Sequence, residues 1–178
     1  MKVLKALKLD QVDESTQEVF VAIKQKVGML PNLYAAIGNS SELLKGFLSF
    51  ASTLEAGIFT PKENEAIALA VSQENNCNYC LSAHSALGKM VGFSEEELIE
   101  IRKGEITDSK FKALIKLASE LTANKGNASQ ESIENFLAQG YSHKALTELI
   151  GMVVLRSFTN YIFSNGDFEI DFPQVKSL

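Results

Sequence analysis

The sequence contains no tryptophan, three prolines and only two cysteines among its 178 residues. A small secreted scaffold held together by disulfides would spread more cysteines along the chain, so that class of protein is excluded. The first ten residues contain neither a long apolar core nor the small-residue cleavage site of a secretory signal peptide. We therefore expect a cytoplasmic protein.

Long apolar runs and basic clusters are also missing. No apolar stretch reaches the ~18 residues that a membrane-spanning helix needs. The chain carries 17 basic and 22 acidic residues, for a formal net charge of −5, and its lysines and arginines form no run. A mild acidic excess disfavours a phosphate-binding surface. We expect neither a membrane nor a nucleic acid as partner.

The hydrophobic pattern is that of a helical protein. Apolar residues recur at helical spacing in segments that begin or end at Gly, Ser or Asn. No segment alternates apolar and polar residues with period two, as a strand would. The predicted helices are Asp13–Lys26, Asn32–Ile37, Ser40 or Ser41 to Leu54, Pro61–Gln73, Cys77 to the Gly88–Gly92 region, Ser94–Gly104, Asp108–Lys125, Ser129–Gly140 and His143–Phe163. We expect an all-α, single-domain fold: an N-terminal segment at 1–14, a helical domain at 15–166 and a C-terminal tail at 167–178.

The two cysteines form a Cys-x-x-Cys pair at the start of a predicted helix. At ~100° per residue, Cys77, Cys80 and His84 fall within about 60° of one another, on the apolar face of that helix. The helix N-terminus offers unpaired N–H groups and a partial positive charge, which favour the reactive thiolate. His84 projects back one turn toward Cys80 and can accept or return its proton.

Glu65 is the fourth candidate for the site. It directly precedes the apolar run Ala66–Val71, which is typical of a core helix and precedes the cysteines. A carboxylate in such a run needs a partner, because burying a bare charge is costly. We expect His84 to be that partner, since a carboxylate can orient an imidazole and raise its basicity.

Two alternatives use the same residues differently. Cys77 and Cys80 could be buried structural cysteines, and His84 could be a hydrogen-bonded core histidine. A zinc site would need a fourth ligand from Glu65 or His143, and three ligands within one and a half helical turns fit tetrahedral geometry poorly. We interpret His143, which follows a Ser cap at a helix start, as structural, and expect no metal.

The spacing Glu65-x11-Cys77-x2-Cys80-x3-His84 resembles the motif of the AhpD-like alkylhydroperoxidases, within the carboxymuconolactone decarboxylase superfamily. Gly28–Tyr34 is similar to a segment that precedes this motif in the family. The stretch from Phe111 to Asn160 is similar to the second half of its peroxidase-related members. The resemblance covers roughly residues 15–166.

The resemblance implies an all-helical AhpD-like fold, assembly into trimers or hexamers, and no cofactor. By analogy, Cys80 attacks the peroxide and becomes a sulfenic acid. Cys77, nearer the helix tip and more exposed, condenses with it to a disulfide, which a dithiol or a lipoylated protein then reduces. Glu65 and His84 form the proton relay.

One position departs from the family. The well-studied members carry a histidine directly before the second cysteine, where this chain has Tyr79. A tyrosine is a poor base near neutral pH, so the relay is shorter and turnover is slower or uses another donor. Tyr79 falls off the cysteine face of the helix. It is either an accessory residue or a packing residue against a neighbouring helix or subunit.

Three functions remain after this reading. The favoured one is a thiol-dependent peroxidase that uses Cys80, Cys77, His84 and Glu65. A carboxymuconolactone-type decarboxylase is the second, although those enzymes do not depend on a cysteine pair. The third is a non-catalytic, redox-sensing or stress oligomer whose disulfide switches a partner surface.

Overall fold

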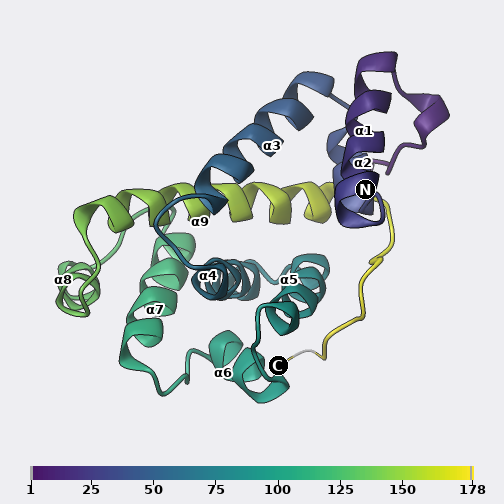
Figure 1. The fold of residues 1–178 in the computed structure, drawn as a ribbon. Coiled ribbons are helices and arrows are strands. Elements are labelled where there is room, and N and C mark those ends of the chain that lie inside the picture. The colour runs from purple at the N-terminus through teal and green to yellow at the C-terminus, as the bar shows by residue number, and fades with distance from the viewer. Residues whose placement is uncertain (1, 177) are drawn as a thin grey trace.

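The structure of the protein is a computed structural model that describes residues 2–176 and 178. Over these residues it contains nine α-helices and no β-strand (Figure 1), which confirms the all-α fold class. The helices are α1 (Glu14–Val27), α2 (Asn32–Ile37), α3 (Ser41–Glu55), α4 (Pro61–Glu74), α5 (Asn78–Met90), α6 (Glu95–Lys103), α7 (Ser109–Ala123), α8 (Gln130–Ala138) and α9 (His143–Asn165). One short 3-10 turn, Leu9–Gln11, precedes them.

The helix starts follow the capping signals of the sequence. Thr60 accepts a hydrogen bond from the backbone N–H of Glu63, whose carboxylate accepts one from the N–H of Thr60. Ser94 and Glu97 form the same reciprocal pair at the start of α6. Each such cap satisfies backbone groups that the first helical turn leaves free. The turns between the helices are therefore defined locally.

Helix α4 occupies the centre of the molecule and packs against α5, α7 and α9 (Figure 1). Its residues Ala66–Leu69 are fully buried, which explains why no polar face interrupts this part of the sequence. Alanines on opposite sides of α4 let neighbouring helices approach closely, while Ile67 and Leu69 each contribute about 1.5–3 kcal/mol of burial energy. This central position holds Glu65 inside the protein, facing α5.

The longest helix, α9, crosses the molecule and supports the other face of α4. Leu149, Met152 and Leu155 are buried in its middle, and Arg156 and Asn160 bring polar groups into the interior one turn later. Although α9 is long and largely apolar, no helix in the described residues has the length and hydropathy needed to cross a membrane.

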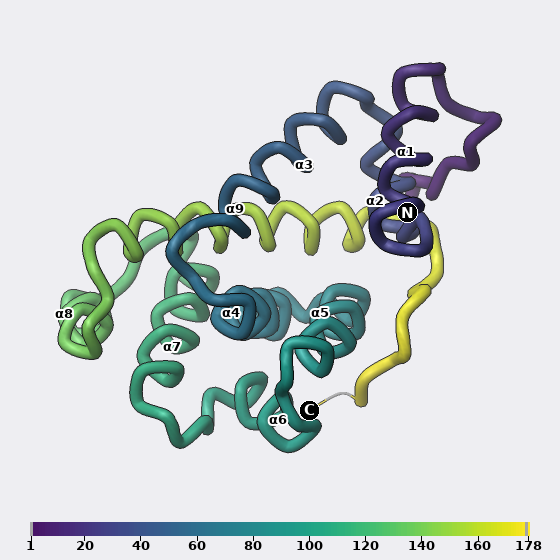
Figure 2. The backbone as a smooth tube through the Cα atoms, viewed as in Figure 1, coloured from purple at the N-terminus to yellow at the C-terminus, as the bar shows by residue number. Residues whose placement is uncertain are grey.

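The C-terminal residues after α9 lie along the surface of the helical body instead of leaving it (Figure 2). Phe168 and Phe172 pack edge-on against the ring of Tyr79 in α5. Farther along, the N–H of Val175 donates to Ser82 Oγ, 3.4 Å away. The prediction of a non-helical tail did not include this packing. The segment runs beside the start of α5, where both cysteines lie.

Candidate active site

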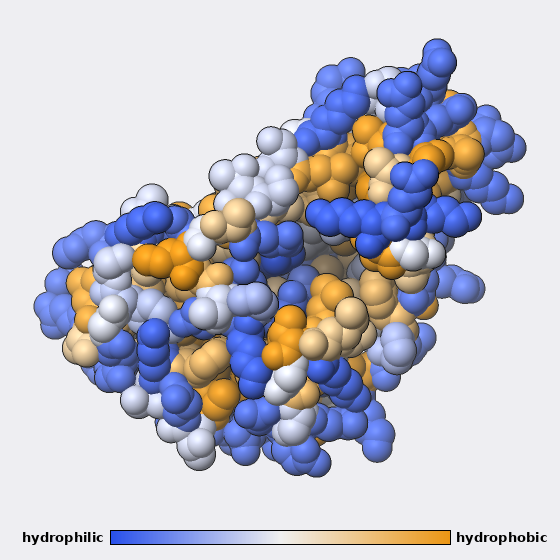
Figure 3. All heavy atoms as spheres, viewed as in Figure 1, coloured by the Kyte–Doolittle hydropathy of each residue, from blue (hydrophilic) through white to orange (hydrophobic). Residues whose placement is uncertain are grey.

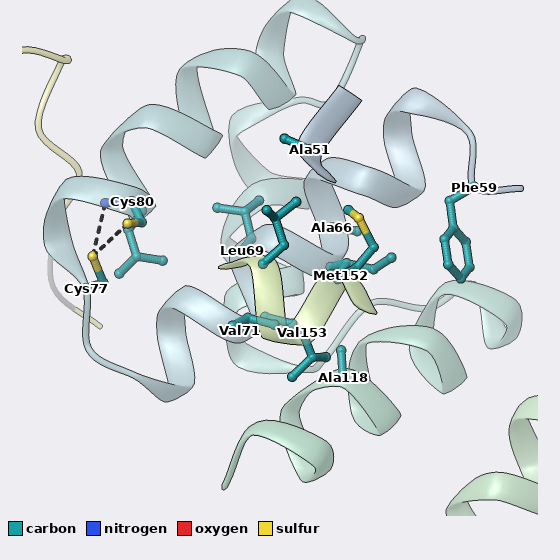
Figure 4. Packing of buried hydrophobic residues seen from close by; sticks show 14 of the residues in the cluster. Ala51, Phe59, Ala66, Leu69, Val71, Cys77, Cys80, Ala118, Met152 and Val153 are labelled. Atoms are coloured by element: carbon teal, nitrogen blue, oxygen red, sulfur yellow. Dashed lines mark hydrogen bonds between the residues drawn. The ribbon is translucent and has the colours of Figure 1, made fainter. Parts of the chain in front are cut away.

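The cysteine pair lies where α5 begins (Figure 4). Cys77 is the N-cap residue of α5, and its Sγ accepts a hydrogen bond from the backbone N–H of Cys80 at 3.4 Å. The two Sγ atoms are 2.8 Å apart and both thiols are free. A disulfide needs an S–S distance of about 2.05 Å, so the sulfurs point at one another with less than 1 Å left to close.

The two thiols differ in their tendency to ionise. The S–H and N–H of Cys80 both donate to Cys77, and these hydrogen bonds lower the pKa of Cys77 despite its burial. The neighbouring Cys77 sulfur and burial together raise the pKa of Cys80 well above its usual value. The pair therefore loses its first proton as a unit, and the two pKa shifts favour Cys77 over Cys80 as the sulfur that ionises.

Polar groups of α9 complete the surroundings of the sulfurs. The side-chain amide of Asn160 lies beside the cysteine pair and lowers the pKa of Cys77. Its amide is held in place because its Nδ2 donates to Ser72 Oγ at 3.3 Å and its Oδ1 accepts from Asn75 Nδ2 at 2.8 Å. Asn160 was not among the site residues predicted from the sequence. A buried polar residue within the apolar second half of α9 was the available signal.

Glu65 and His84 meet between α4 and α5, as their positions in the sequence predicted. Nδ1 of His84 lies 2.8 Å from Oε2 of Glu65, and the two side chains are only 11% and 13% exposed. The carboxylate fixes the ring and assigns the proton-carrying nitrogen to Nδ1, which leaves Nε2 free to exchange a proton with a ligand.

A cavity of about 190 Å³ connects these groups. Cys80, Glu65 and His84 all line it, whereas Cys77 does not. The surface view shows a hollow between the arm that contains α1 and α3 and the body that contains α4 and α5 (Figure 3). The cavity walls also include apolar side chains of α3, α5 and the C-terminal segment, namely Phe47, Leu87 and Phe172. A small molecule in this cavity meets Cys80 first.

Arg156 and Tyr34 also line this cavity, and the sequence analysis missed both. Arg156 is 6% exposed, and its Nε has no hydrogen-bond partner among the described residues. Among the described residues, the only carboxylate that forms an ion pair with it is that of Glu55, 3.6 Å from its Nη2. Leaving a buried donor unpaired costs about 1–3 kcal/mol, more when the group is charged. Burial raises the pKa of the Tyr34 phenol, and Arg156 opposes that shift.

Tyr79, the departure from the family motif, is buried away from the reacting groups. Its hydroxyl accepts a hydrogen bond from the N–H of Leu33 at 3.2 Å, and its ring packs on Phe163, Phe168 and Phe172. Burial and the neighbouring carboxylate of Asp171 raise its pKa far above the usual range of a phenol. These contacts give Tyr79 a packing role that holds the C-terminal segment and α2 against α5.

Two further expectations concern the exposure of Cys77 and the position of His143. Cys77 is not more exposed than Cys80, because both are 2% exposed; that expectation was wrong, since Asn160 and the packing of α5 against α9 cover the helix tip. His143 begins α9 at the protein surface. Within residues 2–176 and 178, no group of three or more His, Cys, Asp or Glu side chains is arranged to hold a metal ion.

Comparisons with known proteins agree with this geometry. The fold and the site together define an AhpD-like helical protein. Residues 41–123, which include the whole Glu–Cys–Cys–His motif, match the model of the Carboxymuconolactone decarboxylase family. This match and the shared fold support the resemblance to the AhpD-like and carboxymuconolactone decarboxylase superfamily that the motif predicted. No curated protein shows significant similarity to it.

Solved structures share the fold over nearly the whole chain. The debrominase Bmp8, crystallised as a variant in complex with 2,3,4-tribromopyrrole, has a TM-score of 0.81 and 18% identity over 96% of this chain and 92% of its own. A peroxidase-related protein from Silicibacter sp. TM1040 has a TM-score of 0.78 and 22% identity, covering 98% and 93%. An alkylhydroperoxidase AhpD core protein from Ralstonia eutropha JMP134 has a TM-score of 0.78 and 16% identity, covering 90% and 89%.

Proposed function

We propose that this protein is a thiol-dependent peroxidase that reduces peroxides through a disulfide between Cys77 and Cys80. The observation that carries the proposal is the cavity that Cys80 shares with the Glu65–His84 pair, with the second sulfur 2.8 Å behind the first. A nucleophile, a proton donor and a resolving thiol are the three groups that peroxide reduction needs. The peroxidase-related structural neighbours support the same reaction class.

The first step oxidises Cys80. Its proton passes to the Cys77 thiolate across the short sulfur contact, which creates a Cys80 thiolate without changing the charge of the pair. This thiolate attacks the terminal oxygen of ROOH, the O–O bond breaks, and Cys80 becomes a sulfenic acid. The leaving alkoxide takes a proton from the His84 imidazolium, which Glu65 stabilises, and departs as ROH.

The second step closes the disulfide. Cys77 attacks the sulfur of the Cys80 sulfenic acid, the S–O bond breaks, and the hydroxide leaves as water with the proton that Cys77 had received. The balance is ROOH plus two thiols giving ROH, water and one disulfide. Disulfide formation needs little movement of the chain, because the sulfurs are 2.8 Å apart and need to approach by less than 1 Å.

The reductant must reach a buried disulfide. Both cysteine residues are 2% exposed, and of the two only Cys80 lines the cavity, so a reductant enters by the same opening as the substrate. A slender dithiol fits this path better than a folded thiol protein does. We propose a small dithiol or the dithiol arm of a lipoylated protein, which attacks Cys80, releases Cys77 as the thiol and then closes its own disulfide.

Thiol titration tests the proposal directly. Denatured protein is assayed for thiols before and after one equivalent of an organic hydroperoxide, and again after dithiothreitol. We expect two thiols to be lost per chain and both to return with the reductant. Loss of no thiol, or loss that dithiothreitol does not reverse, contradicts a redox disulfide.

Reductive debromination is the second candidate, favoured by the aromatic lining of the cavity and by the debrominase neighbours. The same two thiols supply two electrons: the C–Br bond breaks, the ring carbon takes a proton, bromide leaves, and the thiols end as a disulfide. Release of bromide from 2,3,4-tribromopyrrole with dithiothreitol, and no peroxide turnover, would select this function over the first.

The remaining hypotheses make different predictions for the thiols. A decarboxylase of the carboxymuconolactone type would retain activity on a lactone acid after both cysteines are alkylated. A redox sensor would oxidise once, slowly, and show no turnover with any reductant. Assembly into trimers or hexamers stays a prediction of the family resemblance, and sedimentation equilibrium measures it.

A further inference from the structure

The chain has two arginines, Arg102 and Arg156, and both are buried. Their surroundings differ. Arg102 donates from Nε to Gln73 Oε1 at 2.9 Å and from Nη2 to the carbonyl of Lys176 at 2.9 Å. These hydrogen bonds within the protein account for its buried position. Arg156 lies in the wall of the Cys80 cavity, and its Nε has no partner in the described part of the chain.

Contacts within the described residues satisfy few of the hydrogen-bond donors of Arg156. A guanidinium carries five N–H donors and stays charged at every accessible pH, so a buried one needs anionic or carbonyl partners. Its one ion pair is long, with Nη2 at 3.6 Å from a carboxylate of Glu55 whose side chain is 52% exposed. The nearby Glu65 is already bonded to His84. Donors of Arg156 therefore remain for a molecule inside the cavity.

The cavity has the composition of a site for an organic anion. Phe47, Leu87 and Phe172 contribute apolar surface to the cavity that Arg156 also lines. Tyr34 lines the same space, and burial raises the pKa of its phenol, so its hydroxyl keeps a proton to donate. Hydrogen peroxide would use neither the apolar wall nor the cation. A compact organic molecule with one acidic group would use both.

We propose that the cavity binds a small organic substrate that carries a carboxylate, with the carboxylate bonded to Arg156 and the reacting atom at Cys80. This rests on the proposed function, because the reacting atom is the peroxide oxygen of a carboxylate-bearing hydroperoxide. Arg156 acts by binding, since a planar guanidinium holds a carboxylate with two parallel hydrogen bonds and so fixes its orientation. Tyr34 donates to the same group.

Steady-state kinetics with a matched substrate pair tests the proposal. The probes are the para-carboxylate of cumene hydroperoxide and its methyl ester, which have the same peroxide and differ in charge. We expect the protein to favour the acid by about 10–100-fold in kcat/KM, mainly through KM. Arg156→Gln should abolish that preference, and Arg156→Lys should retain part of it. Arg102→Gln, which removes the other buried guanidinium, should leave the preference unchanged.

Binding without turnover separates this inference from the proposed function. In a Cys77→Ser, Cys80→Ser protein, the para-carboxylate of cumyl alcohol should bind at least about tenfold more tightly than cumyl alcohol itself, as measured by calorimetry. Because Arg156 is intact in that protein, the result stands even if Arg156→Gln does not fold. Equal affinity for the acid and the neutral alcohol overturns the inference. If the double variant binds the acid preferentially while the wild-type protein consumes no peroxide, the anion site stands and the peroxidase proposal fails.

Discussion

Nδ1 of His84 lies 2.8 Å from Oε2 of Glu65, although the residues are 19 positions apart on neighbouring helices. The turn between α4 and α5 brings these residues together. In this turn Asn76 adopts a positive φ of 53°, which reverses the chain direction so that Cys77 can cap α5. The same reversal that places the cysteines at a helix N-terminus therefore delivers the carboxylate to the histidine. One turn therefore positions both the cysteine pair and the Glu65–His84 pair.

The first prediction concerns that carboxylate. Glu65→Gln keeps the shape of the side chain and removes its charge, so the His84 imidazolium loses its counter-charge and the neutral imidazole loses the partner that fixes its tautomer. We expect kcat/KM for peroxide to fall by about 10²–10⁴, the usual contribution of a positioned acid or base. Stopped-flow measurement of disulfide formation reports this step.

A matched control lies on the same helix. Glu74→Gln changes an exposed carboxylate at the C-terminal end of α4 and should alter the rate by less than about twofold. His84→Asn should lose as much as Glu65→Gln, and the double variant little more, because the two residues act as one unit. Additive losses in the double variant would show that they act separately.

The second prediction distinguishes the two sulfurs. Cys80→Ser should consume no peroxide, since the only cysteine in contact with the cavity is gone. Cys77→Ser should consume one equivalent and stop as a sulfenic acid, which dimedone traps and mass spectrometry locates on Cys80. If both single variants turn over with dithiols at the full rate, the disulfide is not part of the reaction.

The third prediction follows from the pKa shifts. Hydrogen bonds from Cys80 lower the pKa of Cys77, so its thiolate should persist to a lower pH than that of a free cysteine, whose pKa is about 8.5. Cys80→Ala removes the S–H donor, and the pKa of Cys77 should rise. The pH dependence of iodoacetamide alkylation, followed peptide by peptide, measures both. An unchanged profile in Cys80→Ala would mean that the sulfurs do not share a proton.

Much of this site could be predicted from the sequence because its parts are local. The cap at Cys77, the in-phase His84 and the carboxylate of Glu65 in an apolar run all follow from helical periodicity within 20 residues. Helix boundaries could be predicted equally well. Thr60, Ser94 and similar residues cap the helices through hydrogen bonds to backbone groups three positions farther along the chain. Such signals do not depend on how distant segments pack.

The residues that sequence reasoning missed come from distant segments. Arg156 and Asn160 lie on α9, and nothing in the local pattern says that this face of α9 meets the start of α5. Tyr79 was ambiguous for the same reason: its partners, Leu33 and Phe168, lie 46 and 89 residues away. Long-range pairing of helices is a property of the whole core, which helical periodicity does not encode.

The fourth prediction assigns Tyr79 a structural role. Tyr79→Phe leaves the N–H of Leu33 without its acceptor, so the free energy of unfolding should fall by about 1–3 kcal/mol. Peroxidase kcat should change little, because the phenol proton never leaves at neutral pH. Chemical denaturation and steady-state assays on one preparation decide the point. A large loss of kcat with unchanged stability would make Tyr79 part of the proton relay.

The fifth prediction concerns the C-terminal segment that covers the cavity. Phe168 and Phe172 both pack edge-on against Tyr79, with ring centroids 5.8 and 5.7 Å away, but only Phe172 lines the cavity. Phe172→Ala and Phe168→Ala should therefore lose similar stability, about 1–3 kcal/mol each. Only Phe172→Ala should speed the alkylation of Cys80 by a bulky maleimide, because it alone widens the path to the sulfur. Equal acceleration in both variants would mean that loosening of the whole segment, and not the Phe172 side chain, controls access to Cys80.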